Sequence, residues 1–469
     1  MIKNFIKNNN IENSSKSLEG RGYVLIQVIV FSTIATYLLA ALISWAVTDV
    51  KASKQASDRE LSIQIAEAGI DYYRWHLAHA PIDYQDGTGV AGPYIHDFYD
   101  KDDNKIGTFT LDITPPLLGS SLVVVKSTGR PDAEPDIART IQAKFAKPSI
   151  AKYAVVTNDV MRFGEGTEIF GPVHSNKGIR FDGLTHNIIT SSVTAYDDPD
   201  HTGNNEYGVH THTPPIDPLP PTAVPSRPDV FKAGRRFPVP EVDFTGITAD
   251  IAQMKSGAVA NGFWKTGSGS LGYHITLKTN GTFDLRKVTK LYSIGSCPNE
   301  KWSIQTDSLI GNYPLPSNGI IFLEDNIWVD GQINGARITI IAATLPDNPS
   351  TRKNITINND LLYTNYNGTD AIGLIAQNNI NVGLMSDDNL QIDASLIAQK
   401  GCVGRYYYNS SCSSTYYKRQ SLTLNGMIAS AIRYGFAYTD DTGYQIRNLN
   451  YDSDLLYSPP PSFPLTSDQ

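Results

Sequence analysis

Residues 22–47 read GYVLIQVIVFSTIATYLLAALISWAV, and this stretch decides how the rest of the chain is organised. Residues 23–47 carry no formal charge, so a helix rising about 1.5 Å per residue would extend roughly 37 Å over them. That length crosses a bilayer with some tilt. Most polar residues in the run are hydroxyls, which can donate to helix carbonyls and so cost little in lipid. The sequence therefore predicts a membrane-spanning helix over 23–47 that continues over 48–80.

The charges in front of this run predict its orientation. They are mainly basic: Lys3, Lys7, Lys16 and Arg21 against Glu12 and Glu19. The positive-inside rule then keeps the N-terminus in the cytoplasm and places the C-terminal bulk outside. A cleaved secretory signal peptide is the competing interpretation, but the apolar run is long and no Ala-x-Ala-like site follows it. Because the small residue Gly22 precedes the run instead, we expect residues 1–22 to be a leader and the mature chain to begin at Tyr23.

This N-terminal arrangement, followed by Ala66-Glu67-Ala68 within residues 57–75 (SDRELSIQIAEAGIDYYRW), resembles the prepilins of type IV pili, in particular the PilX-type minor pilins. The resemblance covers about residues 20–80. It implies a subunit of a type IV pilus or related pseudopilus, or an assembly factor. Its implied partners are prepilin peptidase, other pilin-like subunits, the assembly machinery and membrane lipid. The fifth mature residue is Gln27 where major pilins carry Glu, which favours a minor subunit.

Residues 57–75 also predict an amphipathic helix without any resemblance. Apolar or small side chains recur at steps of three and four, namely Leu61, Ile65, Ala68, Tyr72 and Trp75. Such a stripe can pack on the protein's own next domain or on sister helices in a filament. Together with Gln27, we take these residues as candidates for packing within a filament.

Residues 81–148 predict a small antiparallel β domain, as the resemblance to pilins also implies. Alternating runs at 107–113, 121–125 and 138–145 are separated by turn residues. Residues 100–104 are acidic, but Lys105 stands where a calcium-binding EF-hand loop needs Gly. We therefore expect a polar hairpin turn there.

From residue 149 onward, short β-rich runs stop at Gly or Asn, which is the pattern of a parallel β-solenoid. The runs lie at 166–170, 178–182, 319–323, 326–330, 336–341, 354–358, 372–376, 379–382, 390–393 and 422–425. The phrases at 373–376, 393–398 and 425–429 resemble the right-handed β-helix domains attached to PilX-type N-termini. The predicted fold class is mainly β with a long N-terminal α-helix, with solenoid coils over 149–212 and 271–457. Because the spacing is irregular, a β-sandwich remains the alternative.

Two segments are predicted to stand apart from the coils. Residues 213–228 are rich in proline, which cannot donate to a β ladder, so we expect residues 213–270 to form an insertion over the surface. A short helix is expected from Ile247 to Met254. Residues 458–469 begin Ser-Pro-Pro-Pro-Ser and are expected to be a loose tail.

Cysteine and tyrosine gather in one polar segment of the second half. Cys402 and Cys412 lie close in sequence, and outside the cytoplasm such a pair can form a disulfide, which leaves Cys297 as a buried thiol. Five tyrosines flank this loop: Tyr406, Tyr407, Tyr408, Tyr416 and Tyr417. Exposed tyrosines can bind surface glycans or proteins, or they can simply cover the solenoid.

Composition and motifs argue against several other functions. The net charge of −8 does not suit a nucleic-acid partner, because phosphate binding needs a basic surface. We expect no cofactor and no metal: the histidine-rich stretch, which holds His201, His210, His212, Asp197, Asp198 and Asp200, is predicted to be a solvated polar loop. The predicted function is non-enzymatic, namely filament capping or surface attachment by a single-pass membrane protein.

Two other functions stay open. One is a membrane-tethered β-helix enzyme acting on carbohydrates, for which turn carboxylates are available: Asp182, Asp325, Asp330, Asp387, Asp388 and Asp393. The other is a permanently anchored surface adhesin.

Overall fold

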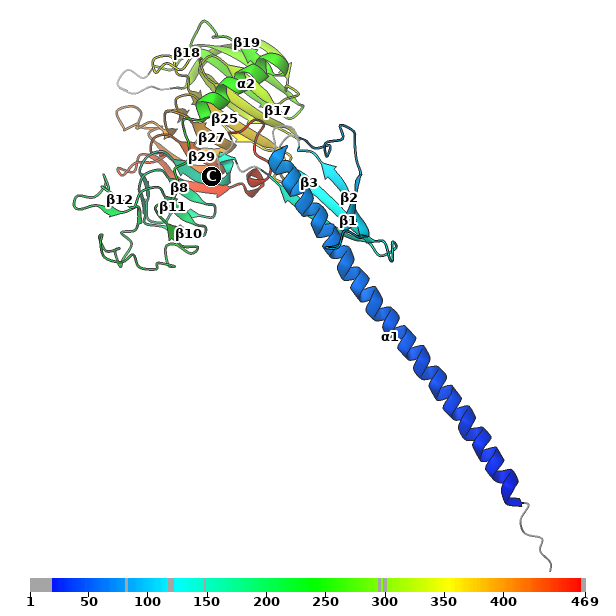
Figure 1. Ribbon diagram of the computed structural model, residues 1–469. Coiled ribbons are helices and arrows are strands. Elements are labelled where there is room, and N and C mark those ends of the chain that lie inside the picture. The colour runs from blue at the N-terminus through cyan, green and yellow to red at the C-terminus, as the bar shows by residue number, and fades with distance from the viewer. Residues whose placement is uncertain are drawn as a thin grey trace, which may run out of the picture. The chain divides into compact units, whose positions relative to one another are not determined.

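The computed structural model describes residues 19–80, 83–116, 122–146, 149–293, 297 and 302–464 (Figure 1). The chain divides into two compact units. Unit 1 comprises Met1–Ile113 and Val125–Ala143, and unit 2 comprises Thr114–Val124 and Lys144–Gln469. Of the predicted leader, residues 1–18 lie outside the described residues.

Unit 1 is built on one unbroken helix, α1 (Glu19–His79), drawn as a single rod in Figure 1. No glycine or proline interrupts it over residues 23–68, which are mostly good helix formers or branched apolar residues. Within the apolar half, hydroxyls donate to carbonyls one turn back, as in the 2.8 Å bond from Thr33 Oγ1 to the Val30 carbonyl. The hydroxyls of Ser32, Thr33 and Thr36 are therefore satisfied within the helix, as lipid requires.

The second half of α1 carries a four-stranded sheet in the order β1-β2-β3-β4. The strands are β1 (Tyr94–Tyr99), β2 (Lys105–Thr114), β3 (Val123–Pro131) and β4 (Arg139–Phe145). β1 pairs antiparallel with β2 through a turn in which Asp100 Oδ1 accepts from the amides of Asp102 and Asn104, so the predicted polar hairpin is confirmed. β1 itself was not predicted, because its alternating side chains are mostly polar or aromatic.

Unit 2 consists mainly of parallel strands, and the longest series of paired strands is called ladder A here. In spatial order, ladder A contains β16 (Phe263–Lys265), β20 (Ile320–Leu323), β22 (Arg337–Ala342), β25 (Ala371–Ala376), β27 (Asn389–Ala398), β29 (Lys418–Ser430), β5 (Val155–Thr157), β8 (Val173–Ser175), β11 (Ile189–Ser191) and β15 (Arg235–Arg236). All of these pairings are parallel, whereas a β-sandwich is built from antiparallel neighbours.

Other parallel pairings flank ladder A. One series is β17 (Gly272–Lys278), β21 (Ile327–Gln332), β23 (Ile355–Thr356), β26 (Ile380–Val382) and β28 (Val403–Arg405). Another is β24 (Leu361–Leu362), β27, β29 and β30 (Gly443–Tyr451). Shorter groups are β6 (Met161–Phe163) with β9 (Ile179–Phe181) and β14 (Val209–His210), and β7 (Glu168–Ile169) with β10 (Leu184–Thr185). Antiparallel pairs join β17 to β18 (Thr282–Leu291), β18 to β19 (Ile304–Pro314), and β12 (Ala195–Tyr196) to β13 (Glu206–Tyr207).

The core of unit 2 is a file of aliphatic side chains stacked strand upon strand. Along ladder A the register places Ile321, Ile340, Leu374, Leu396, Ile428, Val155, Val173 and Ile189 opposite one another in turn. Each of these side chains is at most 1% exposed. Stacking them buries on each strand the apolar face that the strand could not bury alone.

The order of strands in ladder A differs from their order in sequence. β29, near the end of the chain, pairs with β5, the first strand of unit 2, so that Ile428 faces Val155. Strands 155–236 extend from this junction in one direction, and strands 263–430 extend from it in the other. The two ends of unit 2 therefore meet within the ladder, and each covers an edge that the other would leave open.

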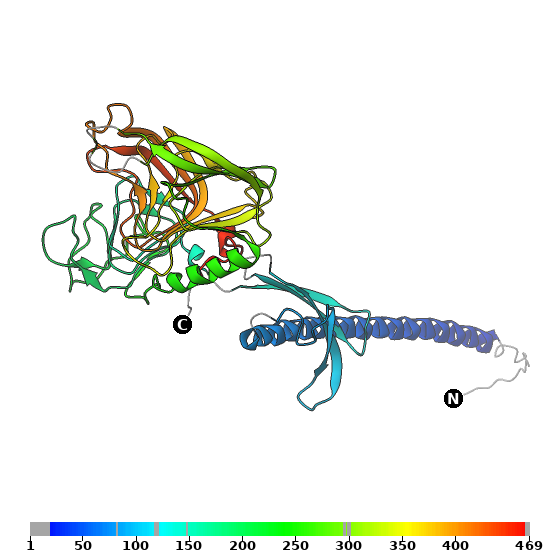
Figure 2. The ribbon, with the colours of Figure 1, turned by 90° about the horizontal axis from the view of Figure 1, so that it is seen from above.

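The outer face of ladder A is also apolar, and α2 (Ile247–Asn261) covers it. Ile251, Met254 and Ala258 of α2 pack with Phe322, Ile341 and other outward side chains of the ladder. Figure 2 shows α2 lying against the strands of unit 2. The predicted helix from Ile247 to Met254 is present and extends further. The Pro-rich region does not stay entirely outside the ladders, because β15 and β16 both join ladder A.

The end of the described chain is fixed to unit 2, so the predicted loose tail is wrong for residues 458–464. The Arg337 guanidinium donates to the carbonyls of Ser458 and Pro459 at 2.6 Å, and Thr339 Oγ1 donates to that of Pro461. Phe463 is 3% exposed within the cluster that contains α2. Prolines have no amide hydrogen to donate, so these prolines are hydrogen-bonded through their carbonyls.

The remaining regular elements are two short 3₁₀ helices, η1 (Ile150–Lys152) and η2 (Ser453–Leu456), each begun by a polar cap.

Candidate functional site

The apolar half of α1 is uncovered in unit 1. Every residue from Tyr23 to Ser57 is exposed, including Phe31 and Trp45 at 69% each. Among the described residues, α1 is the one helix long and apolar enough to cross a membrane, over a stretch that starts at Tyr23. Gly22 and Tyr23 lie inside α1, one turn after its start, and Gln27 is exposed on it. This surface needs lipid or other helices to cover it, because large exposed apolar patches otherwise favour association.

The predicted packing stripe divides between two environments. Ile65 is fully buried, and Leu61, Ala68 and Tyr72 are half-buried. Trp75 is 61% exposed and contacts His79 of its own helix. The protein's own sheet therefore covers most of the stripe, and packing of these residues on sister helices stays a prediction.

The face of α1 that meets the sheet is shifted by about one residue from the predicted stripe. It is formed by Ser62, Ile65, Ala66, Gly69 and Tyr73. Small residues make the approach possible from both sides. A Cβ at Gly129 of β3 would lie 2.6 Å from the Ala66 amide nitrogen, and one at Gly69 would lie 2.8 Å from the Phe109 ring. The junction is thus a close contact between backbones that side chains would hold apart.

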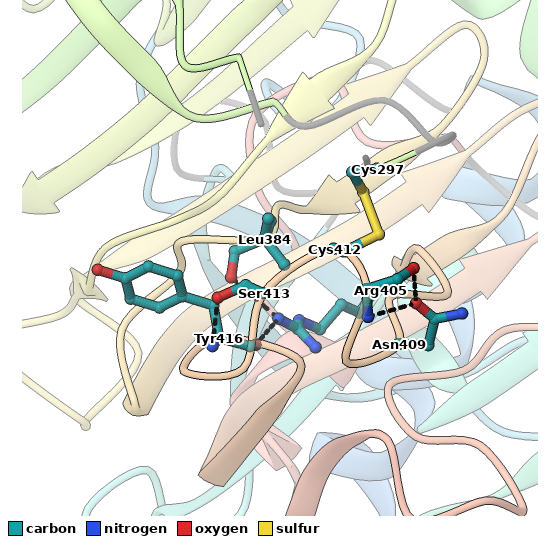
Figure 3. Close-up of a disulfide and its surroundings, with 8 residues drawn as sticks. Cys297, Leu384, Arg405, Asn409, Cys412, Ser413 and Tyr416 are labelled. Carbon is teal, nitrogen blue, oxygen red and sulfur yellow. Dashed lines mark hydrogen bonds between the residues drawn. A yellow bond between two sulfur atoms is a disulfide. The ribbon is translucent and has the colours of Figure 1, made fainter. Parts of the chain in front are cut away.

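The disulfide of unit 2 joins Cys297 to Cys412, so the predicted Cys402–Cys412 bridge is wrong (Figure 3). Cys402 is a free thiol at the start of β28, where its amide donates to Asn379 Oδ1 at 2.8 Å. Burial raises the pKa of this thiol. Cys402 directly precedes β28, whereas Cys412 lies with Cys297, Leu384 and Tyr408 in a separate apolar cluster. Proximity in sequence was a poor guide because the bridge spans 115 residues.

The five tyrosines do not form one exposed surface. Tyr408 is fully buried, so the prediction of surface binding is wrong for it. Tyr406 is half-buried and stacks on Trp302, while Tyr416 and Tyr417 are half-buried beside Arg419 and Lys418. Tyr407 is 39% exposed and donates to Asp440 Oδ2 at 2.6 Å. Most of this group covers the parallel strands, as the alternative interpretation expected.

A buried arginine that the sequence did not single out organises this region. The Arg405 guanidinium donates to the carbonyls of Leu384 at 3.0 Å and Tyr416 at 2.7 Å, beside the disulfide (Figure 3). It also lies over the rings of Tyr408 and Tyr444. Burial lowers the pKa of Arg405 to about 10, which still leaves it charged at neutral pH. Arg405, the last residue of β28, therefore ties the cysteine loop to the strands that pair with β28.

A histidine between two carboxylates lies on β17. His274 Nδ1 is 2.8 Å from Asp307 and its Nε2 is 2.8 Å from Asp330. Burial acts to lower the pKa of His274, but the two carboxylates outweigh it, and the pKa is raised above its usual value. Arg286 also bonds Asp307, at 2.9 Å. The arrangement is an ion-pair network across β17, β18, β19 and β21.

The other turn carboxylates mostly act as local caps. Asp393 is fully buried and accepts from the Tyr363 amide and the Tyr366 hydroxyl. Asp325 accepts from the Ser268 amide and hydroxyl. Asp387 accepts from Asn359, and Asp388 from the Gln420 amide. Bonds of this kind stabilise neighbouring turns of the chain and occupy the oxygens that a glycosidase would use.

The histidine-rich stretch is not a solvated loop throughout, so that prediction is wrong for its central residues. Asp198 is 4% exposed and His210 is fully buried, although Asp197, Asp200 and His201 are exposed. Asp198 Oδ2 lies 3.6 Å from His210 Nε2 and 3.7 Å from Arg180 Nη1. The sequence did not indicate this burial, because it comes from the pairing of β14 with β9.

Comparison with known proteins gives one kind of match. No protein-family model matches the sequence, and no curated protein matches it. A solved pilin is similar. It is the competence-associated pilin ComZ from Thermus thermophilus, which is 12% identical and aligns over 88% of this chain and 95% of its own, with a TM-score of 0.32. With so low a score, the proposal below rests on the geometry of the chain itself.

Proposed function

We propose that this chain is a pilin-like minor subunit or assembly factor of a type IV pilus or related pseudopilus. It would be a single-pass membrane protein with a cytoplasmic N-terminus, and with the sheet of unit 1 and all of unit 2 outside. The observation that carries the proposal is the division of α1. Its first half is apolar and uncovered, while its second half is packed on a four-stranded sheet of the same unit.

This division suits a helix that exchanges one apolar environment for another. The uncovered apolar surface spans residues 23–47, whereas residues 48–57 include Asp49, Lys51 and Lys54 and can remain in water. Lipid covers residues 23–47 in the membrane, and neighbouring helices would cover the same residues in a filament. Gln27 cannot form the charged contact attributed to the Glu of major pilins, which supports a minor role.

We further propose that unit 2 is a β-solenoid that the subunit presents at the cell surface, without enzymatic activity. The parallel ladders and the stacked aliphatic file support a solenoid, and the carboxylates bonded to neighbouring turns support a non-catalytic role. Its partners would be surface glycans or proteins on the outer side, and pilin-like subunits and the assembly machinery along α1.

Mass spectrometry of the N-terminus tests the proposal. The full chain is produced in membranes together with a prepilin peptidase, and the mature chain should begin at Tyr23. Gly22→Val should block the cleavage, whereas Gly20→Val, a matched change in the same leader, should leave it intact. An intact N-terminus in the unmodified chain would contradict the proposal and would favour a permanently anchored adhesin.

A further inference from the structure

In unit 2, three chain segments bring five metal-ligating side chains together: Asp198, His201, Glu206, His210 and His212. Their ligand atoms form two overlapping groups, Asp198–His210–His212 and His201–Glu206–His212, and within each group the atoms lie within 4.8 Å of one another. His212 belongs to both groups.

The inner group contains buried atoms that lack a partner. Asp198 Oδ2, His210 Nε2 and His212 Nε2 are all buried and have no hydrogen-bond partner among the described residues. Asp198 Oδ2 and His210 Nε2 are 3.6 Å apart, which is too long for a hydrogen bond. Leaving a buried carboxylate oxygen and an imidazole nitrogen unpaired is costly. A bound cation, which accepts lone pairs, would remove this free-energy cost.

The backbone and the ring partners hold these groups in place. His210 Nδ1 lies 3.3 Å from the Tyr207 carbonyl, which can only accept, so Nδ1 carries the proton and Nε2 presents its lone pair to the group. The His212 amide donates to Asp182 Oδ1 at 2.8 Å, and Asp198 Oδ1 accepts from the Asp200 amide at 3.0 Å. The partners of His210 Nδ1 and Asp198 Oδ1, on the far side of these two ligands, are typical of protein metal sites.

The spacing suits a small cation with nitrogen and oxygen ligands. Zinc bonds His and carboxylate at about 2.0–2.2 Å, so tetrahedral ligands lie roughly 3.3–3.6 Å apart. His212 Nε2 is 3.4 Å from Glu206 Oε1, and His201 Nδ1 is 3.3 Å from the same oxygen. Together with the 3.6 Å between Asp198 and His210, these separations match those of first-sphere ligands, and the remaining pairs within each group lie within 4.8 Å.

The charge balance points the same way. Asp182, Asp198 and Glu206 bring three negative charges, and Arg180 brings one positive charge. Arg180 Nε bonds Asp182 at 2.7 Å, while its Nη1 stays 3.7 Å from Asp198 Oδ2. With neutral imidazoles, two negative charges remain, which one divalent cation would balance.

We infer that unit 2 binds one divalent transition-metal ion of the zinc type, held by Asp198, His210 and His212. His201 is exposed and lies on the solvent side of the cluster. Nitrogen-rich ligand sets disfavour Ca²⁺ and Mg²⁺, which prefer all-oxygen sites. The ion would fasten the loop after β12, which holds Asp198, to β14, which holds His210, so its role is to fix that loop on the sheet of β6, β9 and β14.

The experiment is a zinc titration of the full chain in detergent after removal of metals by a chelator. Bound zinc is counted by elemental mass spectrometry, and affinity is measured by competition with a chromophoric chelator. We expect one zinc per chain, and Ca²⁺ or Mg²⁺ in excess should not displace it. Co²⁺ should bind in its place and give the visible absorption of a tetrahedral site.

Variants identify the ligands. His212→Gln and His210→Gln should weaken binding by more than about 100-fold, because even outer partners of a metal site are worth roughly 10–100-fold. His201→Gln should keep one zinc per chain. His186→Gln is the matched control, since His186 pairs with Glu168 outside the cluster and should leave affinity unchanged. Circular dichroism of each variant separates lost binding from lost folding.

Two results would overturn the inference. One is zinc uptake that is substoichiometric and equal in the unmodified chain and His212→Gln. The other is full binding by His210→Gln together with loss in His201→Gln, which would mean that the inner group is not the site. Neither result bears on N-terminal processing, so the proposed pilus function stands or falls separately.

Discussion

Gly129→Ala should separate α1 from its sheet. A Cβ at this position would lie 2.6 Å from the Ala66 nitrogen and 3.0 Å from Ile65 Cβ, and still closer to the Ser62 carbonyl oxygen. The Ser62 carbonyl and the Ala66 amide are one turn apart, so they stand as partners in an α-helical hydrogen bond. Because backbone atoms cannot rotate away as side chains can, the helix must retreat by about 1 Å to restore ordinary contact distances.

The expected cost follows from two opposing terms. Overpacking a tight contact costs about 1–3 kcal/mol, and a backbone obstacle places this change near 3 kcal/mol. Replacing Gly by Ala also restricts the unfolded chain, which returns about 0.4–1 kcal/mol. The net loss of about 2 kcal/mol should speed exchange of the helix amides that open with this junction by roughly 30-fold, since 1.4 kcal/mol is a factor of ten.

Hydrogen exchange followed by mass spectrometry, on the full chain in detergent, measures this directly. Peptides covering residues 58–79 should exchange faster in Gly129→Ala, while peptides of unit 2 should not change. Gly164→Ala is the control, because a Cβ there meets nothing within 4 Å. If Gly129→Ala altered exchange over 58–79 no more than Gly164→Ala does, the packing of α1 on β3 would be refuted.

Three further predictions concern unit 2. Non-reducing peptide mapping should link Cys297 to Cys412, and a mapped bond to Cys402 would contradict this. Cys297→Ser should lower the free energy of unfolding by about 2–4 kcal/mol, whereas Cys402→Ser should leave the bridge intact. His274→Gln should lower Tm most below about pH 6.5. The raised pKa of His274 adds stability at low pH, and that stability is lost as pH rises through the folded-state pKa. A loss of Tm that grows at higher pH would count against the charged network. Arg337→Met should speed hydrogen exchange in residues 458–464 by at least about tenfold, since it removes two charge-assisted bonds; unchanged exchange there would show that these bonds do not hold the segment.

Local patterns carried most of the fold prediction. The uncharged run and its amphipathic continuation indicated one helix, and α1 follows it without a break. Runs such as 372–376 and 422–425 lie within β25 and β29, because short branched segments between Gly and Asn report their own strand propensity. Hydrophobic periodicity and turn residues depend on only a few neighbouring residues, so the sequence alone can reveal them.

Long-range placement could not be predicted in this way. The pairing of β29 with β5, the bridge from Cys297 to Cys412 and the anchoring of residues 458–464 all join distant parts of the chain. The same holds for the histidine cluster, where burial arises from strand pairing and not from composition. The face of α1 that meets the sheet lies about one residue from the predicted stripe, which shows the same limit, because glycines at this junction decide which face α1 presents.

The central claim is that α1 leaves lipid to pack with helices of other subunits. A photo-crosslinking amino acid at Phe31, which is 69% exposed, tests it in cells that assemble a type IV pilus. The account predicts adducts with another pilin-like subunit in the sheared filament fraction, formed by a chain that lacks residues 1–22. A probe at Tyr366 of unit 2 should not give that adduct. Adducts with lipid alone, from an uncleaved chain that stays in the membrane fraction, would contradict the account.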